Sequence, residues 1–199
     1  MAVTAEKVKE LRNKTGAGVM DCKRALEASG GDLEKATDYL RKKGISVAQQ
    51  RANRETKEGV VTSYIHPGSK LGVLLEINCE TDFVARTEGF QSLAKDMAMQ
   101  IAATNPLAIN REALTPEVIE RERQIYVEQA KNQGKPEKVI ERIVDGKMEK
   151  FFQQVCLLEQ PFIKNPDITV SELLTQFIAK VGENITIRRF TRYRLGEGE

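Results

Sequence analysis

The first 44 residues place hydrophobic positions at helical spacing, interrupted by capping residues and glycines about every dozen residues. This pattern predicts three short helices. The first begins after Thr4 and ends at Gly16, the second follows the turn at residues 15–18, and the third begins after Asp32 and ends at Gly44. Because helices this short are not stable in isolation, the three must pack against one another.

Hydrophobic residues alternate with polar ones in the middle of the chain and again near its end. Val60–Ile65 is rich in β-branched residues, residues 66–70 form a polar turn, and Leu71–Cys79 alternates regularly. Such a pattern is typical of a β-hairpin. A final strand is predicted over Asn184–Arg194, where apolar residues stand at Ile185, Ile187 and Tyr193.

Helical periodicity returns between these strands. Four helices are predicted over residues 89–104, 116–132, 136–155 and 170–181. The second of them follows Thr115 as N-cap and has Pro116 at its first position. Since only a short Gly-Lys-Pro turn separates the second from the third, these two should form an antiparallel helical hairpin. The fold class is therefore α+β, with an antiparallel sheet.

The predicted elements fall into three parts. Residues 1–45 form a three-helix domain, and residues 46–58, which are mostly polar, form a linker or an exposed helix. Residues 59–199 form the α+β core.

Composition narrows the class of protein. Hydrophobic residues make up 40% and charged residues 30% of the 199, which is a globular composition. No apolar run approaches the ~20 residues of a membrane helix, and the N-terminus lacks the apolar centre of a signal peptide, so we expect a cytoplasmic protein. Residues 1–58 carry 13 basic and 9 acidic side chains, a weak indication of an acidic partner surface.

Residues suited to catalysis or metal binding are scarce. Cys22, Cys79 and Cys156 are widely separated and odd in number, and His66 is the one histidine. Neither paired zinc ligands nor a catalytic triad follows from them. No glycine-rich phosphate loop is present. We therefore expect no catalytic residue, metal or cofactor, although an enzyme acting through Cys79, Glu80 or Asp82 stays a weak alternative.

The C-terminal strand combines four arginines with two aromatic residues. Aromatic rings stack on bases and arginines bind phosphates, so this strand is one candidate for RNA binding. The alternative is an edge strand protected by charge. The residues concerned are Arg188, Arg189, Phe190, Arg192, Tyr193 and Arg194.

The turn Thr81-Asp82-Phe83-Val84 lies where a predicted strand ends and a helix begins. Short turns on a rigid scaffold often carry function. Local chemistry also allows a purely structural role, in which Thr81 caps the helix, Asp82 favours its positive end and Phe83 belongs to the core.

Three segments resemble the elongation factor Ts family. They are VKELRNKTGAGVMDCKRALEASGGDLEKATDYLRKKG (Val8–Gly44), LLEINCETDFVAR (Leu74–Arg86) and GENITIRRFTRYRLGEG (Gly182–Gly198). The match is collinear and spans nearly the whole chain. It implies a guanine-nucleotide exchange factor that binds elongation factor Tu with GDP, dislodges Mg²⁺ and promotes GDP release so that GTP can bind.

The resemblance also implies roles for particular residues. The three-helix domain would be similar to ubiquitin-associated domains and would contact the partner's GTPase domain through Leu11, Arg12 and Met20. Thr81, Asp82, Phe83 and Val84 would act on Mg²⁺ in the partner.

This chain shows one core subdomain where longer family members have two. We therefore expect a homodimer and a complex of two factors with two partners. Pairing through the last strand, near Thr191, would be non-covalent, and the helical hairpin is the other candidate interface. We expect no membrane partner and no direct nucleic-acid contact.

Overall fold

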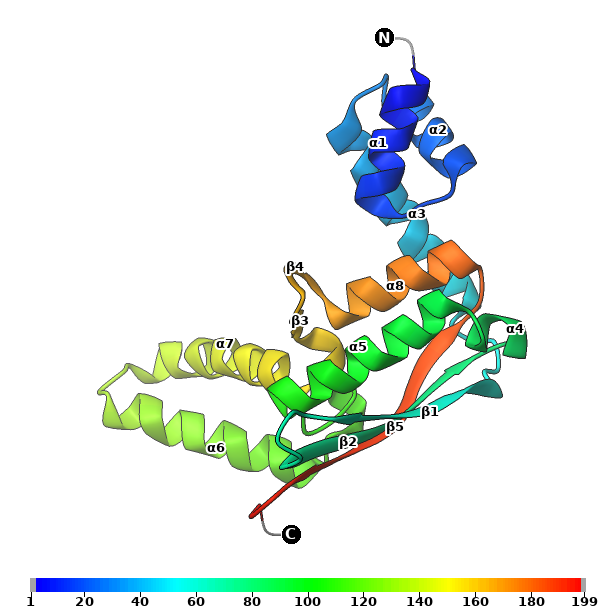
Figure 1. The fold of residues 1–199 in the computed structure, drawn as a ribbon. Coiled ribbons are helices and arrows are strands. Elements are labelled where there is room, and N and C mark those ends of the chain that lie inside the picture. Colours follow the sequence, from blue (N-terminus) through cyan, green and yellow to red (C-terminus); the bar gives the residue numbers. More distant parts are fainter. Residues whose placement is uncertain (1–2, 198–199) are drawn as a thin grey trace. The chain divides into compact units, whose positions relative to one another are not determined.

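The computed structural model describes residues 3–197, and it is a mixed α+β fold (Figure 1). The chain divides into two compact units. The first contains the residues up to Val60 together with Ile77–Ser92 and Glu172–Arg188, and the second contains Val61–Glu76, Leu93–Ser171 and the residues from Arg189 onward. The α+β class predicted from the sequence is confirmed.

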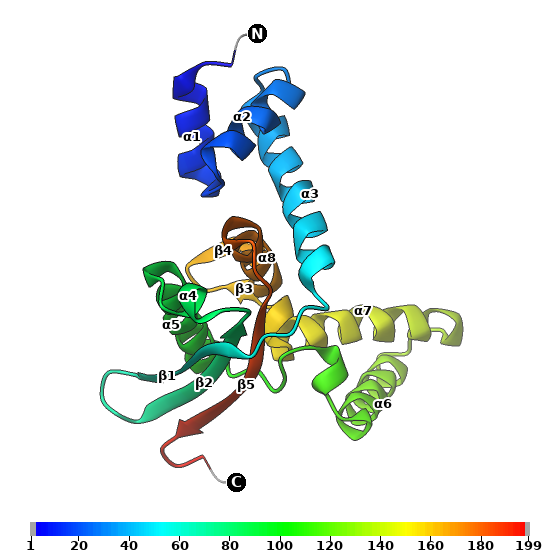
Figure 2. The same cartoon turned by 90° about the vertical axis from the view of Figure 1, so that its right-hand side faces the viewer.

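Three helices begin the first unit, as predicted (Figure 2). They are α1 (Ala5–Thr15), α2 (Val19–Ala28) and α3 (Leu33–Arg51). The hydroxyl of Thr4 accepts a hydrogen bond from the N–H of Lys7, and Asp32 caps α3 in the same way through the N–H groups of Glu34 and Lys35. The core between the helices consists of fully buried side chains: Leu11, Cys22, Ala25, Leu26 and Ala36.

The prediction that the third helix ends at Gly44 is wrong. Helix α3 continues through Gly44 to Arg51 and takes up about half of the stretch predicted as a linker or exposed helix. A Cβ added at Gly44 would lie 3.5 Å from the Cβ of Ala179, so the bare glycine allows a close approach of two backbones. The missing side chain serves packing here and does not end the helix.

A three-stranded sheet has the order β1-β2-β5. Strands β1 (Glu58–Ile65) and β2 (Leu71–Cys79) form the predicted hairpin, closed by a 2.9 Å hydrogen bond from the N–H of His66 to the carbonyl of Leu71. Strand β5 (Ile185–Arg194) is followed by a 2.8 Å bond from the N–H of Leu195 to the carbonyl of Lys70, so it ends where β2 begins.

The alternation predicted for the last strand does not hold along its whole length. Ile185 and Ile187 are buried, but Arg188 and Arg189 are both exposed and Tyr193 is exposed as well. Because successive side chains in a strand point to opposite faces, two consecutive outward residues shift every later inward position by one residue. The prediction that Tyr193 continues the row begun by Ile185 and Ile187 is therefore wrong.

Helices α5 (Glu88–Thr104) and α8 (Val170–Val181) supply much of the remaining core. Gly89 at the start of α5 lies 3.5 Å, measured from a built Cβ, from the ring of Phe177 on α8. In the second unit, the Nε of Arg192 donates to the carbonyl of Ala102 over 3.3 Å, which joins the end of α5 to β5.

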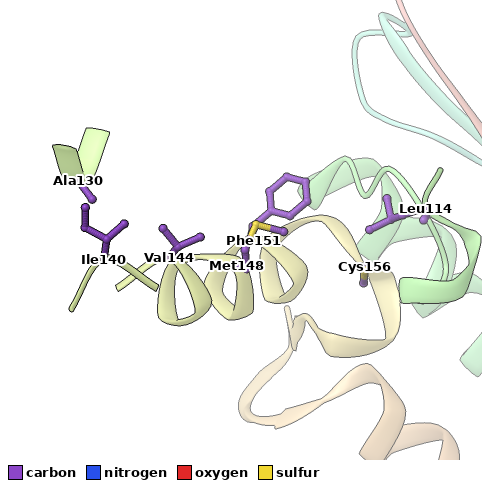
Figure 3. Packing of buried hydrophobic residues seen from close by; sticks show 8 residues of the cluster. Leu114, Ala130, Ile140, Val144, Met148, Phe151 and Cys156 are labelled. Carbon is purple, nitrogen blue, oxygen red and sulfur yellow. The ribbon is translucent and has the colours of Figure 1, made fainter. Parts of the chain in front are cut away.

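Helices α6 (Pro116–Asn132) and α7 (Glu137–Val155) form the predicted antiparallel hairpin (Figures 1 and 2). Gly146 does not interrupt α7. Figure 3 shows the row of buried side chains along α7 and the residues packed with it. They are Leu114, Ala130, Ile140, Val144, Met148, Phe151 and Cys156.

Three short elements that the sequence periodicity did not predict follow α5 and α7. Two are 3-10 turns, η1 (Arg111–Ala113) and η2 (Leu157–Glu159). The third is a small antiparallel pair, β3 (Pro161–Phe162) with β4 (Asn165–Thr169). Buried Gln100 fixes this pair, since its Oε1 accepts from the N–H of Ile163 over 2.8 Å.

No helix within residues 3–197 is long and apolar enough to cross a membrane.

Candidate functional site

The turn after β2 is a four-residue helix, α4 (Asp82–Ala85), that presents an aromatic ring to solvent. Thr81 is its N-cap, and the Thr81 hydroxyl accepts a 3.5 Å hydrogen bond from the N–H of Val84. Phe83 is 80% exposed, whereas the side chain of Ala85 is buried. The alternative in which Phe83 belongs to the core is therefore wrong.

Glu183, in the connection between α8 and β5, holds the first residue of this turn. One carboxylate oxygen accepts from the Thr81 hydroxyl over 2.6 Å, and the other accepts from the Thr81 N–H over 3.0 Å. The thiol of Cys79 donates to the Thr81 carbonyl over 3.1 Å. All three polar groups of Thr81 are thus hydrogen-bonded.

A second carboxylate joins the same connection to the end of β2. Glu80 accepts from the N–H of Asn184 over 2.6 Å and from the Arg54 guanidinium over 3.3 Å. Burial acts to raise the pKa of Glu80, but these two donors together lower it below its ordinary value. The Asn184 amide in turn donates to the carbonyls of Ala52 and Arg54. Hydrogen bonds of polar side chains therefore join three chain segments, namely residues 52–54, the end of β2 and the connection between α8 and β5.

Two further contacts stabilise helix α4 at its first and last residues. Gln91 donates to the carbonyl of Ala85 over 2.7 Å, and Asp82 forms an ion pair with Arg86 at 2.8 Å. Thr81, Asp82, Phe83 and Val84 thus form one short turn in which the ring of Phe83 is the large exposed apolar group.

The three N-terminal candidates are placed differently from one another. The side chain of Leu11 is fully buried in the three-helix core, so it packs and offers no surface in this conformation. Arg12 is exposed, and Met20, at the start of α2, is 58% exposed. Val19 beside it is also exposed. Exposed apolar side chains are therefore available at the start of α2, and an exposed cation is available in the last turn of α1.

The arginines of β5 are largely paired with acidic groups. Arg189 contacts Glu76 at 2.7 Å, and Arg192 and Arg194 both contact Glu197, at 2.9 and 3.4 Å. Because phosphate binding depends on cations that are free of acidic partners, this arrangement favours the charge-protected strand over an RNA-binding one.

The residues considered for enzyme chemistry do not assemble into a reactive site. Burial raises the pKa of the Cys79 thiol to about 11, and that thiol already donates to a carbonyl. His66 is exposed and bonds the Tyr64 hydroxyl at 3.0 Å. Within residues 3–197, no group of three or more His, Cys, Asp and Glu side chains is arranged to hold a metal ion.

An open apolar groove of about 600 Å³ lies in the second unit, beside strands β1, β2 and the end of β5. Ile65, Leu74, Tyr193 and Leu195 line it, and each is more than half exposed. Val61 is similarly exposed and stands on the same face of β1 as Ile65, four residues away. This surface could not be predicted from the sequence, because isolated apolar residues near strand ends are common.

The residues that support the turn were not predicted from the sequence; they are Arg54, Gln91, Glu183 and Asn184. Glu183 and Asn184 lie within the segment Gly182–Gly198 that resembles the family's C-terminal signature. The resemblance of this segment to the family is the one feature of the sequence that could have indicated Glu183 and Asn184.

Comparison with known proteins gives a consistent result. A family model described as Elongation factor TS matches residues 5–197. The chain is 62% identical over 196 residues to an elongation factor Ts of Carboxydothermus hydrogenoformans, covering 98% of this chain and 90% of that protein. It is 60% identical over 197 residues to one of Thermodesulfovibrio yellowstonii, covering 99% and 98%. It is 56% identical over 199 residues to one of Nitratidesulfovibrio vulgaris, covering the full length of both.

Proposed function

The chain belongs to the elongation factor Ts family, whose function is guanine-nucleotide exchange on elongation factor Tu, and on this premise we propose that Thr81–Val84 is its exchange element. In this proposal the turn displaces Mg²⁺ from the GDP-bound partner, GDP leaves, and GTP then binds. The observation that carries it is the exposure of Phe83 on a turn whose first residue, Thr81, has its N–H, hydroxyl and carbonyl all hydrogen-bonded.

The physical basis is the demanding coordination of Mg²⁺. The ion requires a near-ideal octahedron of oxygens and anchors the nucleotide phosphates through it. A small displacement of the partner's phosphate-side elements therefore weakens nucleotide binding strongly. Phe83 acts as the apolar wedge, and Asp82 places an anionic group beside it.

The N-terminal helices supply a second contact in this proposal. Met20 and Arg12 present apolar surface and charge to the partner's GTPase domain. Leu11, which is buried, supports that surface by packing the helices beneath it.

Exchange then follows from differential binding. The factor binds the nucleotide-free partner more tightly than the GDP-bound partner, so GDP must weaken the factor's binding by the same ratio by which the factor weakens GDP. No covalent bond changes, and the mechanism assigns this chain no cofactor and no catalytic residue. The proposal places it in the cytoplasm, with no direct contact to nucleic acid or membrane.

The test is the release of fluorescently labelled GDP from elongation factor Tu. We expect the factor to accelerate GDP release strongly in millimolar Mg²⁺ and much less after Mg²⁺ has been removed with EDTA. The reason is that the chelator has then already removed the ion that the factor displaces. Equal acceleration with and without Mg²⁺ would contradict the Mg²⁺ step. No acceleration under either condition would contradict the exchange function.

We further propose that two copies of the chain pair through the apolar groove of the second unit and form a two-plus-two complex with the partner. Support comes from the exposed residues that line it, which include Ile65, Leu74 and Tyr193, and from exposed Val61 on the same face of β1. Large exposed apolar surface on a monomer typically marks an interface. The helical hairpin is a weaker candidate, because the large side chains along the facing side of α7 are buried within the hairpin.

The variant Leu74→Lys tests this interface. Leu74 is 51% exposed, so a lysine is accommodated in the monomer but places a charge within the paired surfaces. Light scattering should report a dimer for the parent protein and a monomer for the variant. Leu107→Lys is the matched control, because Leu107 is 59% exposed outside the groove and should leave the dimer intact. A monomeric parent protein would refute the dimer.

A further inference from the structure

An exposed phenylalanine on a four-residue helix needs support from elsewhere in the chain. Isolated helices are only marginally stable below ~12–15 residues, so α4 has no stability of its own. Phe83 contributes almost nothing, because 80% of its surface faces solvent. The conformation of the turn must therefore come from its contacts with the rest of the first unit.

Glu183 makes the most restrictive of these contacts. It lies 102 residues from Thr81 in sequence, and its two oxygens accept from the N–H and the hydroxyl of that one residue. The pair fixes the Thr81 backbone and its side-chain rotamer together. With the rotamer fixed, the Thr81 oxygen is also aimed at the N–H of Val84 inside the helix.

The other contacts hold the backbone on both sides of Phe83. The Cys79 thiol binds the carbonyl of Thr81, and the Gln91 amide binds the carbonyl of Ala85. The side chain of Ala85 is buried and anchors the last residue of α4. Glu183 differs from these supports because both oxygens of its carboxyl group accept hydrogen bonds from one residue, and hydrogen bonds to carboxylates are stronger than those between neutral groups.

Resting on the proposed function, we propose that Glu183 is a positioning residue for exchange. Its carboxylate holds the turn in the conformation that presents Phe83 before the partner arrives. A turn ordered in advance does not lose conformational freedom at the moment when Mg²⁺ is displaced. The contribution of Glu183 therefore appears in the rate of GDP release from the bound complex rather than in the affinity of the first encounter.

The test compares Glu183→Gln and Thr81→Val, singly and together, with Thr81→Ser as the conservative variant. Glu55→Gln is the matched control, since Glu55 is exposed and its ion pair is with Lys57 and not with a residue of the turn. The maximal rate of labelled-GDP release should fall about tenfold in Glu183→Gln, the scale of one charge-assisted hydrogen bond, with the half-saturating factor concentration unchanged. Thr81→Ser keeps the hydroxyl that donates to Glu183, so its rate should fall less than that of Thr81→Val.

The double variant shows whether the two residues act as one unit. If they do, Thr81→Val combined with Glu183→Gln is no slower than the slower single variant. Multiplying losses would overturn the proposal, because they would show that Glu183 acts independently of Thr81.

Amide hydrogen exchange of the free factor gives a readout that does not involve the partner. The N–H groups of Ala85 and Arg86 bond to the carbonyls of Thr81 and Asp82 over 3.3 and 3.1 Å. They should exchange about tenfold faster in Glu183→Gln than in the parent protein, whereas amides of α1 and α2 should not change. Faster exchange throughout the unit would indicate a general structural role and overturn the proposal.

The outcomes separate this proposal from the function on which it rests. If the parent protein fails to release GDP, the proposed function is wrong, while amide exchange still reports whether Glu183 orders the turn. If the parent protein is active and Glu183→Gln releases GDP at the same rate, the positioning role is wrong and the exchange function stands.

Discussion

The turn at Thr81–Val84 and the hairpin of α6 and α7 place their apolar and polar groups in opposite ways. The turn exposes its ring and is held by hydrogen bonds that Glu183 accepts and that Cys79 and Gln91 donate. The hairpin buries an apolar row between its helices. Its ion pairs, such as Arg123 with Asp145, are on the outside.

This difference separates stability from function in measurable terms. Burial of apolar area is the main stabilising term of a fold, so the hairpin should respond to truncation by losing stability. An exposed ring adds little to the stability of the folded state and is available to bind a partner. Substitutions in the hairpin should therefore change the free energy of unfolding, whereas substitutions of the exposed ring should change the rate of GDP release.

The largest effect is expected from Met148→Ala in the hairpin. Met148 is 4% exposed within the buried row, and its truncation should lower the free energy of unfolding by about 2–5 kcal/mol. Urea denaturation followed by circular dichroism measures this. Val139→Ala is the control, because Val139 is exposed on the same helix and should cost no more than about 0.5 kcal/mol. Equal losses in the two variants would contradict the packing described.

Phe83→Ala should give the reverse result. The free energy of unfolding should change by less than about 0.5 kcal/mol, because the ring makes little contact with the chain. The rate of GDP release should fall about 30-fold, as expected when an interface anchor worth about 2 kcal/mol is removed. Leu107→Ala, another exposed apolar position, should alter neither quantity. A stability loss of about 3 kcal/mol or more would instead place the ring in the core.

The smallest effect is expected at Arg111, which joins η1 to the end of α7. Its guanidinium contacts Glu149 at 2.7 Å and Glu159 at 2.6 Å and lies 4.3 Å from the ring centre of Phe152. Lysine cannot form this forked contact, so Arg111→Lys should cost about 0.2–1 kcal/mol, the range for solvent-exposed ion pairs. Arg123→Lys, which replaces a single contact to Asp145, should cost less.

The pH dependence of this effect follows from Glu149. The hydrogen bond from Arg111 lowers the pKa of that carboxyl below its ordinary 4.5. The stabilisation is therefore complete above pH 4.5 and is lost as the pH falls through the lowered folded-state pKa. Acid titration of unfolding should show the parent protein and Arg111→Lys converging at low pH. A constant difference between them would contradict the ion-pair explanation.

Helix starts were predictable because capping is a local interaction. Thr4 and Asp32 each stand one residue before a helix and cap it through their side chains, whereas Thr115 precedes α6 without a side-chain cap bond and Pro116 marks that start. The end of α3 was not predictable in this way. Gly44 is typical of a helix end, but its role depends on Ala179, which is distant in sequence. Tertiary packing outweighs local preference at that residue.

The candidate site was visible from the sequence only in part. Thr81–Val84 stands out by its position between a strand and a helix, yet hydrophobicity alone would bury Phe83, and only the family resemblance favoured exposure. Glu183 and Asn184 were not recognised as supports, because a hydrogen bond across about 100 residues leaves no periodic pattern. Local rules describe elements, whereas the supports of a site are tertiary.

Three thiols are distributed over the structure and buried in each case: Cys22, Cys79 and Cys156. Burial raises all three pKa values, to about 11 for Cys79 and Cys156. Because alkylating reagents attack the thiolate, these cysteines react only when the surrounding segment opens. The chain therefore carries native reporters for the N-terminal helices, for the strand that leads to α4, and for the end of the helical hairpin. Mass spectrometry of timed alkylation could follow the opening of each region separately, without any introduced label.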